Sequence, residues 1–110
     1  MRLPNAEEAI TPIGKLRDYL LDEEHPDGGP KAVFFAGMGF RREQWQLLEA
    51  ALRADHLTQD AQEIPRSEFG RKFQIVASLT GPNGRRAIIK SIWIIRDGEE
   101  VPRLLTAYPE

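Results

Sequence analysis

Two side chains that could carry out chemistry flank a turn early in the chain. His25 begins a His-Pro-Asp-Gly-Gly-Pro segment over residues 25–30, and Lys31 follows it directly. An imidazole can accept and release protons near neutral pH, and an ammonium group can stabilise the charge of a phosphate. The two glycines allow backbone N–H groups to approach an anion at the start of the helix expected here. We therefore predict that His25 and Lys31 are catalytic, although a helix-ending histidine and a surface lysine would give the same pattern.

Two hydroxyl groups stand near the end of the chain. Thr106 and Tyr108 are two residues apart in a segment with strand character, so their side chains are expected on one face. A pair of hydroxyls can bind a phosphate oxygen or orient a base, and we predict that both are catalytic. Arg103 falls on the opposite face of a regular strand, so it can join them only if a bulge intervenes.

Basic residues outnumber acidic ones between residues 69 and 98, whereas residues 18–27 contain five acidic residues and no lysine or arginine. Basic side chains on strands can contact the phosphates of a nucleic acid, or they can guard a sheet edge against pairing. The residues that we predict to bind substrate are Arg71, Lys72, Arg85, Lys90 and Arg103.

Composition limits the possible classes of function. The chain has 110 residues, a net charge of −2 and no cysteine, which indicates one domain without disulfides or thiolate metal sites. Two histidines are too few for a histidine-rich metal site, and we expect no metal and no cofactor. The N-terminus lacks the apolar region of a signal peptide, and the longest apolar stretch, residues 87–95, is too short for a bilayer. We expect a soluble, cytoplasmic protein.

The hydrophobic pattern changes period halfway along the chain. Apolar residues at helical spacing predict helices over residues 12–24, 29–36 and 42–54, with Tyr19 in the core and His56 as a cap of the third helix. Residues 58–67 are expected to form a loop or at most a short edge strand, because Pro65 lies among them. Alternation then predicts strands over residues 72–80, 86–96 and 101–108. The fold class is therefore α+β, a single domain (1–110) with N-terminal helices packed on a three- to four-stranded antiparallel sheet meander.

Several segments resemble a bacterial domain family of uncharacterised function. They are Leu-Arg-Asp-Tyr-Leu-Leu (16–21), His-Pro-Asp-Gly-Gly-Pro-Lys-Ala (25–32), Phe-Phe (34–35), Thr-Gly-Pro-Asn-Gly-Arg (80–85), Trp-Ile-Ile (93–95) and Pro-Arg-Leu-Leu-Thr-Ala-Tyr-Pro (102–109). Similar segments occur at the ends of phage head-morphogenesis proteins and polymorphic toxins, in domains assigned to the barnase–EndoU–colicin–RelE nuclease superfamily. The resemblance implies helices followed by an antiparallel sheet and metal-independent RNA cleavage. It also implies that His25 and Lys31 on the helical side meet Thr106 and Tyr108 of the last strand.

These observations support two hypotheses of different kinds. The first is a toxin-type endoribonuclease of a toxin–antitoxin or contact-dependent system, with RNA as substrate and His25 as general acid or base. The second is a non-catalytic interaction module, similar to an antitoxin or immunity protein or a scaffold domain. Its acidic segment at residues 18–27 would dock a basic partner. An antitoxin or immunity protein is the partner protein that the first hypothesis implies.

Overall fold

The computed structural model describes all residues from Met1 to Glu110. The helical half consists of short elements, which are η1 (Ala6–Glu8), α1 (Ile13–Lys15), η2 (Leu16–Leu20), α2 (Gly29–Ala36), η3 (Arg42–Gln44) and α3 (Trp45–Asp55). The second half forms the strands β1 (Gln62–Ser67), β2 (Gly70–Thr80), β3 (Arg86–Arg96) and β4 (Arg103–Pro109). None of the helices has the length and apolar character that crossing a bilayer requires.

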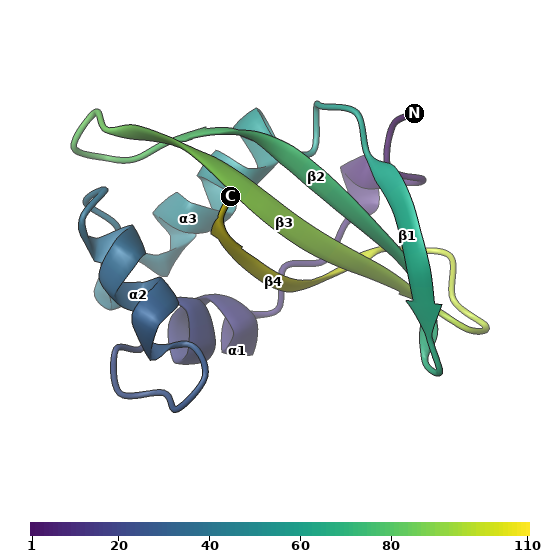
Figure 1. The fold of residues 1–110 in the computed structure, drawn as a ribbon, viewed down its shortest axis with the longest axis horizontal. Helices are drawn as coiled ribbons and strands as arrows, with labels where there is room; N and C mark the ends of the chain where they lie inside the picture. The colour runs from purple at the N-terminus through teal and green to yellow at the C-terminus, as the bar shows by residue number, and fades with distance from the viewer.

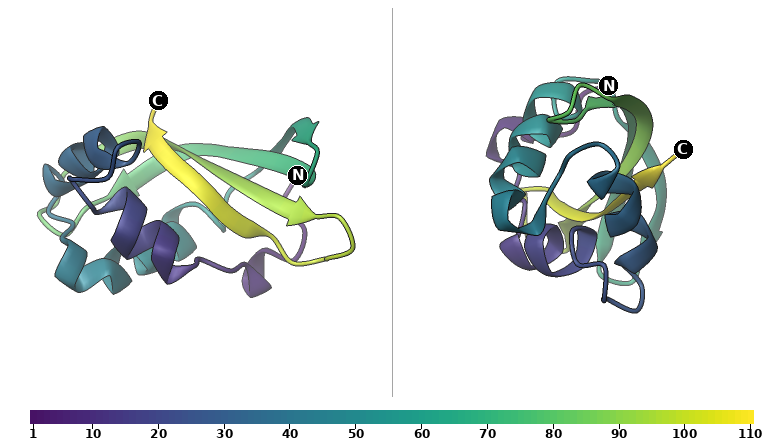
Figure 2. Two further views of the ribbon diagram at one scale, coloured as in Figure 1. Left: turned by 90° about the horizontal axis from the view of Figure 1, so that it is seen from below. Right: turned by 90° about the vertical axis from the view of Figure 1, so that its left-hand side faces the viewer.

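The four strands form an antiparallel meander in the order β1-β2-β3-β4. The helices cover one face of this twisted sheet, with α3 behind β2 and β3 in Figure 1. Strand β4 is an edge strand, and α1, η2 and α2 lie beside it (Figure 2). The predicted α+β class with helices on a sheet meander is confirmed.

The core lies between the helices and the sheet, as the alternation of apolar residues predicts. Phe73, Ile75 and Leu79 of β2 are completely buried, and their neighbours on β3 include Trp93. The helices contribute buried leucines and a phenylalanine to the same cluster, namely Leu16, Leu20, Phe35, Leu48 and Leu52. Burial of one such side chain stabilises the fold by about 1.5–3 kcal/mol.

The first helix is shorter and wider than the periodicity predicts. After α1 the chain enters η2, a π-helical turn that closes with the N–H of Leu21 donating to the carbonyl of Leu16 at 3.0 Å. Leu16, Leu20 and Leu21 are all buried, and the widened turn places them together on the core side. Such π-turns occur often at functional sites.

Both edge strands carry irregular pairing. β1 has six residues, and its register with β2 shifts between Ile64 and Ser67, around Pro65. At the opposite edge, Thr106 of β4 pairs with Ile92 while Leu104 pairs with Trp93, so Leu105 is an extra residue in β4. This is the bulge that Arg103 requires if it is to share a face with Thr106.

The bulge in β4 changes which side chains share a face. Arg103 pairs with Ile94 and Thr106 with Ile92, and these two isoleucines are two residues apart on β3. Arg103 and Thr106 therefore lie on the same face of the sheet, although an odd number of residues separates them.

Candidate functional site

The hydroxyl of Tyr19 is the centre of a small polar cluster. Lys31 Nζ donates a hydrogen bond to Tyr19 Oη, and the same oxygen lies 3.0 Å from Thr106 Oγ1. The ammonium of Lys31 is 4.8 Å from the ring centre of Tyr19 and 5.9 Å from that of Tyr108. The structure thus brings Lys31, Thr106 and Tyr108 together, as the sequence predicts, with Tyr19 between them.

Three elements position these groups. Tyr19 comes from η2, Lys31 from the first turn of α2, and Thr106 from β4. Gly28, just before α2, allows the backbone at the start of α2 to lie close to Tyr19. A Cβ atom there would overlap the carbonyl oxygen of Tyr19 and lie 2.8 Å from its Cδ1. The glycine that the sequence suggests for binding an anion is therefore required for packing α2 against Tyr19.

The environment of Tyr19 makes its hydroxyl more acidic. Partial burial alone would raise the pKa of the phenol, but hydrogen bonds from Lys31 and Thr106 act against it. The positive charges of Lys31 and Lys15 add to these bonds, and the pKa falls below its usual value. Lys15 Nζ lies 5.3 Å from the ring centre of Tyr19. Such a phenol is better able to take a proton from another hydroxyl near neutral pH, since more of it is ionised.

His25 contacts the cluster through its ring. The imidazole stands edge-on to Tyr19, with ring centres 5.0 Å apart and an interplanar angle of 79°. Its Nδ1 accepts hydrogen bonds from the backbone N–H groups of Asp27 and Gly28, each at 3.0 Å. Nδ1 is therefore an acceptor in this geometry, and the hydrogen of the neutral ring lies on Nε2. His25 therefore holds the turn before α2 and leaves a donor, not an acceptor, for other groups.

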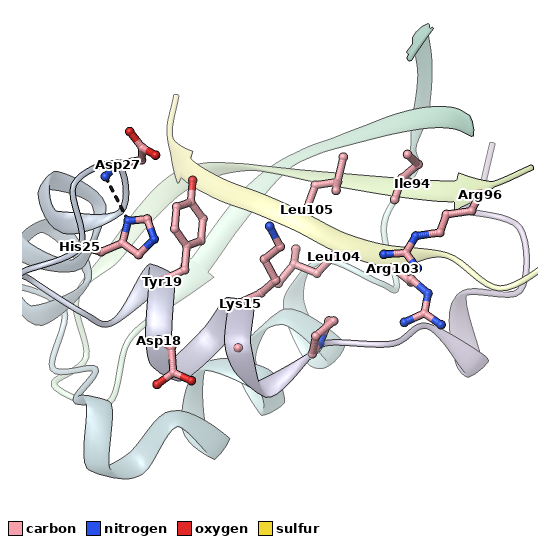
Figure 3. Close-up of a pocket in the computed structure, with 12 residues that line it drawn as sticks. Lys15, Asp18, Tyr19, His25, Asp27, Ile94, Arg96, Arg103, Leu104 and Leu105 are labelled. Carbon is pink, nitrogen blue, oxygen red and sulfur yellow. Dashed lines mark hydrogen bonds between the residues drawn. The ribbon is translucent and has the colours of Figure 1, made fainter. Parts of the chain in front are cut away.

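A cleft of about 630 Å³ runs from this cluster along β4. Figure 3 shows His25 and Tyr19 at one end of it. Arg96 and Arg103 lie at the other end, and Lys15 lies between the two ends in the same view. Three cationic side chains and two carboxylates line the cleft, which gives it an excess of positive charge.

The predicted substrate-binding residues separate into two groups. Arg103 lines the cleft, and Lys90 Nζ lies 5.9 Å from the ring centre of Tyr108 and 3.4 Å from Glu110 Oε2. The other three lie outside the cleft, Arg71 and Lys72 on β2 and Arg85 in the turn between β2 and β3. Arg71 forms two hydrogen bonds with Glu63, Arg85 donates to the carbonyl of Gly37 at 3.3 Å, and Lys72 lies on β2 outside the cleft.

Tyr19 is the member of this cluster that the sequence interpretation missed, because its place in an apolar helical stripe predicts a core residue. The structure shows it half-buried, with its ring on the core and its hydroxyl in the cluster. One signal was present in the sequence. Lys15 and Tyr19 are four residues apart, which is the spacing of neighbours on a helical face.

The acidic segment at residues 18–27 is partly neutralised within the chain. Asp18 binds Arg17 at 2.8 Å and Arg42 at 3.0 Å, and hydrogen bonds from these two arginines lower the pKa of its carboxyl to about 2. Asp22 lies 4.0 Å from Arg42. No group of three or more His, Asp or Glu side chains is arranged to share a metal ion. The docking of a basic partner and the expectation of no metal or cofactor both stay predictions.

Comparison with known proteins identifies a family for the chain. The family model described as "Domain of unknown function (DUF6883)" matches residues 2–110. No curated protein and no solved structure matches the chain. Neither result links the chain to the barnase–EndoU–colicin–RelE superfamily, so that resemblance stays a prediction. Because the match covers almost every residue, the chain belongs to the DUF6883 family of domains.

Proposed function

We propose that the chain is a metal-independent endoribonuclease whose reaction takes place at Tyr19, Lys31, Thr106 and Tyr108. The observation that carries the proposal is the position of the Tyr19 hydroxyl, which is hydrogen-bonded by an ammonium and a second hydroxyl beside a cationic cleft. An ionised phenol is a base, and the groups around it are donors that suit a phosphate. RNA supplies both partners, a ribose 2′-hydroxyl and the adjacent phosphodiester.

The reaction is a transesterification. The Tyr19 phenolate takes the proton of the 2′-hydroxyl, and the 2′-oxygen attacks the neighbouring phosphorus. The bond between phosphorus and the 5′-oxygen breaks, and that oxygen takes a proton from the Tyr108 hydroxyl. The products are a 2′,3′-cyclic phosphate and a 5′-hydroxyl, and both tyrosines return to their starting state by exchange with solvent.

Lys31 and Thr106 stabilise the transition state in this proposal. Negative charge grows on the non-bridging phosphate oxygens as the 2′-oxygen attacks, and the ammonium and the hydroxyl donate to those oxygens. A positioned base contributes roughly 10²–10⁴-fold to the rate, and removing one such donor typically costs about 10²–10³-fold. Lys15 adds positive charge beside the phenol.

We assign the general base that removes the 2′-hydroxyl proton to Tyr19 rather than to His25 because of the geometry of His25. The Nδ1 atom of His25 is occupied by the N–H groups of Asp27 and Gly28, and the remaining nitrogen carries a hydrogen in the neutral ring. His25 then acts as a positioning residue, since it holds the turn before α2 and the face of the Tyr19 ring.

The first experiment incubates purified protein with total RNA in the presence of EDTA. Tyr19→Phe keeps the ring and removes the hydroxyl, so we expect cleavage to fall by about 100-fold or more while the melting temperature changes little. The cleavage ends of the wild-type reaction should be 2′,3′-cyclic phosphates. Absence of cleavage by the wild-type protein, or equal cleavage by Tyr19→Phe, would contradict the proposal.

A pair of His25 variants separates positioning from proton transfer. His25→Asn retains a side-chain acceptor for the N–H groups of Asp27 and Gly28, whereas His25→Ala removes it at a cost of about 1 kcal/mol of stability. We expect the alanine variant to lose more activity than the asparagine variant and the pH–rate profile of His25→Asn to keep its shape. Loss of a limb of that profile in His25→Asn would assign the base to His25 instead.

A further inference from the structure

The end of the cleft away from Tyr19 carries two arginines that the proposed reaction does not use. Arg96 closes β3 and Arg103 opens β4, and both line the same cleft as Tyr19. Arg96 forms no ion pair, and Arg103 is joined only to Glu99. Figure 3 shows both guanidinium groups gathered at this end.

The bulge at Leu105 aligns this end with the reaction site. Because it puts Arg103 and Thr106 on one face of β4, a ligand lying along the strand can meet both. Their partners on β3 are two residues apart, which corresponds to about 7 Å along the sheet. The ion pair with Glu99 holds the Arg103 guanidinium on the side of the β3–β4 hairpin, away from Thr106. Figure 3 places Lys15 and Leu104 between Tyr19 and Arg103, so a ligand that engages both ends of the cleft reaches them with separate anionic groups.

The stretch between the two ends is largely apolar. Leu104 and Leu105 line it on the sheet side, and Lys15 lies opposite them on the helical side. Two anion-binding sites separated by an apolar wall match a single-stranded nucleic acid, whose unstacked bases contact apolar side chains while its phosphates contact cations.

Arg103 is already paired with the Glu99 carboxylate. The distance from Arg103 Nε to Glu99 Oε1 is 3.3 Å, and the two side chains are 29% and 40% exposed. Exposed pairs of this kind contribute little to stability, and a phosphate can replace the carboxylate with little loss.

We propose that Arg103 and Arg96 form a second phosphate subsite, so that the protein binds single-stranded RNA through at least two phosphates of one chain. This inference rests on the proposed function, because the first phosphate is the one at Tyr19. A substrate with one internucleotide phosphate is then bound at one end only. A longer strand gains affinity through Arg103.

The test measures the binding of fluorescent 2′-O-methyl oligouridylates with two or four nucleotides, which lack the 2′-hydroxyl needed for cleavage. We expect the wild-type protein to bind the tetramer about tenfold more tightly than the dimer. Arg103→Gln should remove that gain and reduce the dependence of log affinity on log salt by about 0.7, the value for one phosphate contact on a single strand. Glu99→Gln, which frees Arg103, should tighten binding of the tetramer.

Arg53→Gln is the matched control, because Arg53 is also paired with a glutamate four residues away but lies outside the cleft. It should leave the affinity for the tetramer and its salt dependence unchanged. Equal affinity for the dimer and the tetramer in a protein that cleaves RNA would overturn the subsite and leave the proposed function standing. Failure to bind either oligonucleotide and to cleave RNA would overturn both.

Discussion

At the scale of single residues, the two tyrosines of the chain occupy different electrostatic positions. Tyr19 accepts a hydrogen bond from Lys31 and has Lys15 over its ring, whereas Tyr108 lies between the more distant ammonium groups of Lys31 and Lys90. A donor bonded to a phenol oxygen favours the ionised form, so Lys31 is the residue on which the acidity of Tyr19 depends most among these cations.

This difference predicts the result of a spectroscopic titration. The chain contains two tyrosines, so phenolate absorbance reports on Tyr19 and Tyr108 alone. We expect Tyr19 to ionise below the usual value of about 10, Tyr19→Phe to remove this step, and Lys31→Met to move it upward. Persistence of an early step in Tyr19→Phe would show that the acidic phenol is another group.

At the scale of elements, the arrangement depends on how closely the first turn of α2 approaches η2. Gly28 touches the backbone and ring of Tyr19, and Lys31 follows on the same turn. The position of the Lys31 ammonium over Tyr19 is therefore determined by the packing of two short helical segments and not by either one alone.

We expect Gly28→Ala to destabilise the protein by about 1–3 kcal/mol, because the new methyl group would force η2 and α2 apart. Cleavage should fall as well, since Tyr19 and Lys31 would separate. Gly14→Ala is the stability control, as a Cβ there meets no atom within 4 Å and alanine favours the helix by up to about 1 kcal/mol. Thermal melting of the two variants checks the contrast, which a neutral Gly28→Ala would contradict.

Some features of these elements could be predicted from the sequence pattern and others could not. The alternation of Phe73, Ile75 and Leu79 was sufficient to predict the buried face of β2, because a strand has a period of two. The π-turn of η2 and the bulge at Leu105 could not be predicted in this way. Both irregularities are set by which backbone carbonyl accepts a hydrogen bond from a given N–H group. More than one such hydrogen-bond pattern would place the same side chains in the core. Tyr19 was missed because its place in an apolar helical stripe predicts a core residue, whereas the common face of Thr106 and Tyr108 follows from strand geometry.

At the scale of the whole molecule, α3 is joined to the sheet by a buried polar chain. His56 lies at the end of α3, as predicted, but its side chain is completely buried beneath the sheet. Its Nε2–H donates to the carbonyl of Ala77 at 3.1 Å, and Ser91 Oγ donates to its Nδ1 at 2.7 Å. Ser91 in turn accepts a hydrogen bond from Trp93 Nε1 at 2.9 Å. Only the neutral imidazole satisfies every member of this chain.

Burial lowers the pKa of His56, and the carbonyl of Ala77 and the charge of Asp55 offset only part of this effect. The unfolded chain then binds a proton that the folded protein does not. Stability is therefore fully present above the unfolded pKa of about 6.5 and decreases as the pH falls below it. We expect the free energy of unfolding to decline with a slope of at most about 1.4 kcal/mol per pH unit, which urea unfolding at a series of pH values measures.

His56→Gln should be less stable than the wild-type protein and should lose this part of the pH dependence. His25→Asn is the matched control, because it removes the other histidine and leaves the buried chain intact. Retention of the slope in His56→Gln would assign the pH dependence to other groups.

The extra residue in β4 has a consequence for related chains of different length. On both sides of Leu105 the pairing with β3 is in phase, since Leu104 meets Trp93 and Thr106 meets Ile92. A chain without Leu105 would keep every remaining residue of β4 turned toward the same side, with an uninterrupted ladder. Loss of this residue is therefore compatible with the sheet, and what it would change is the wall of the cleft and the bend of the strand. Natural length variation at this point would change the shape of the cleft before it altered the fold.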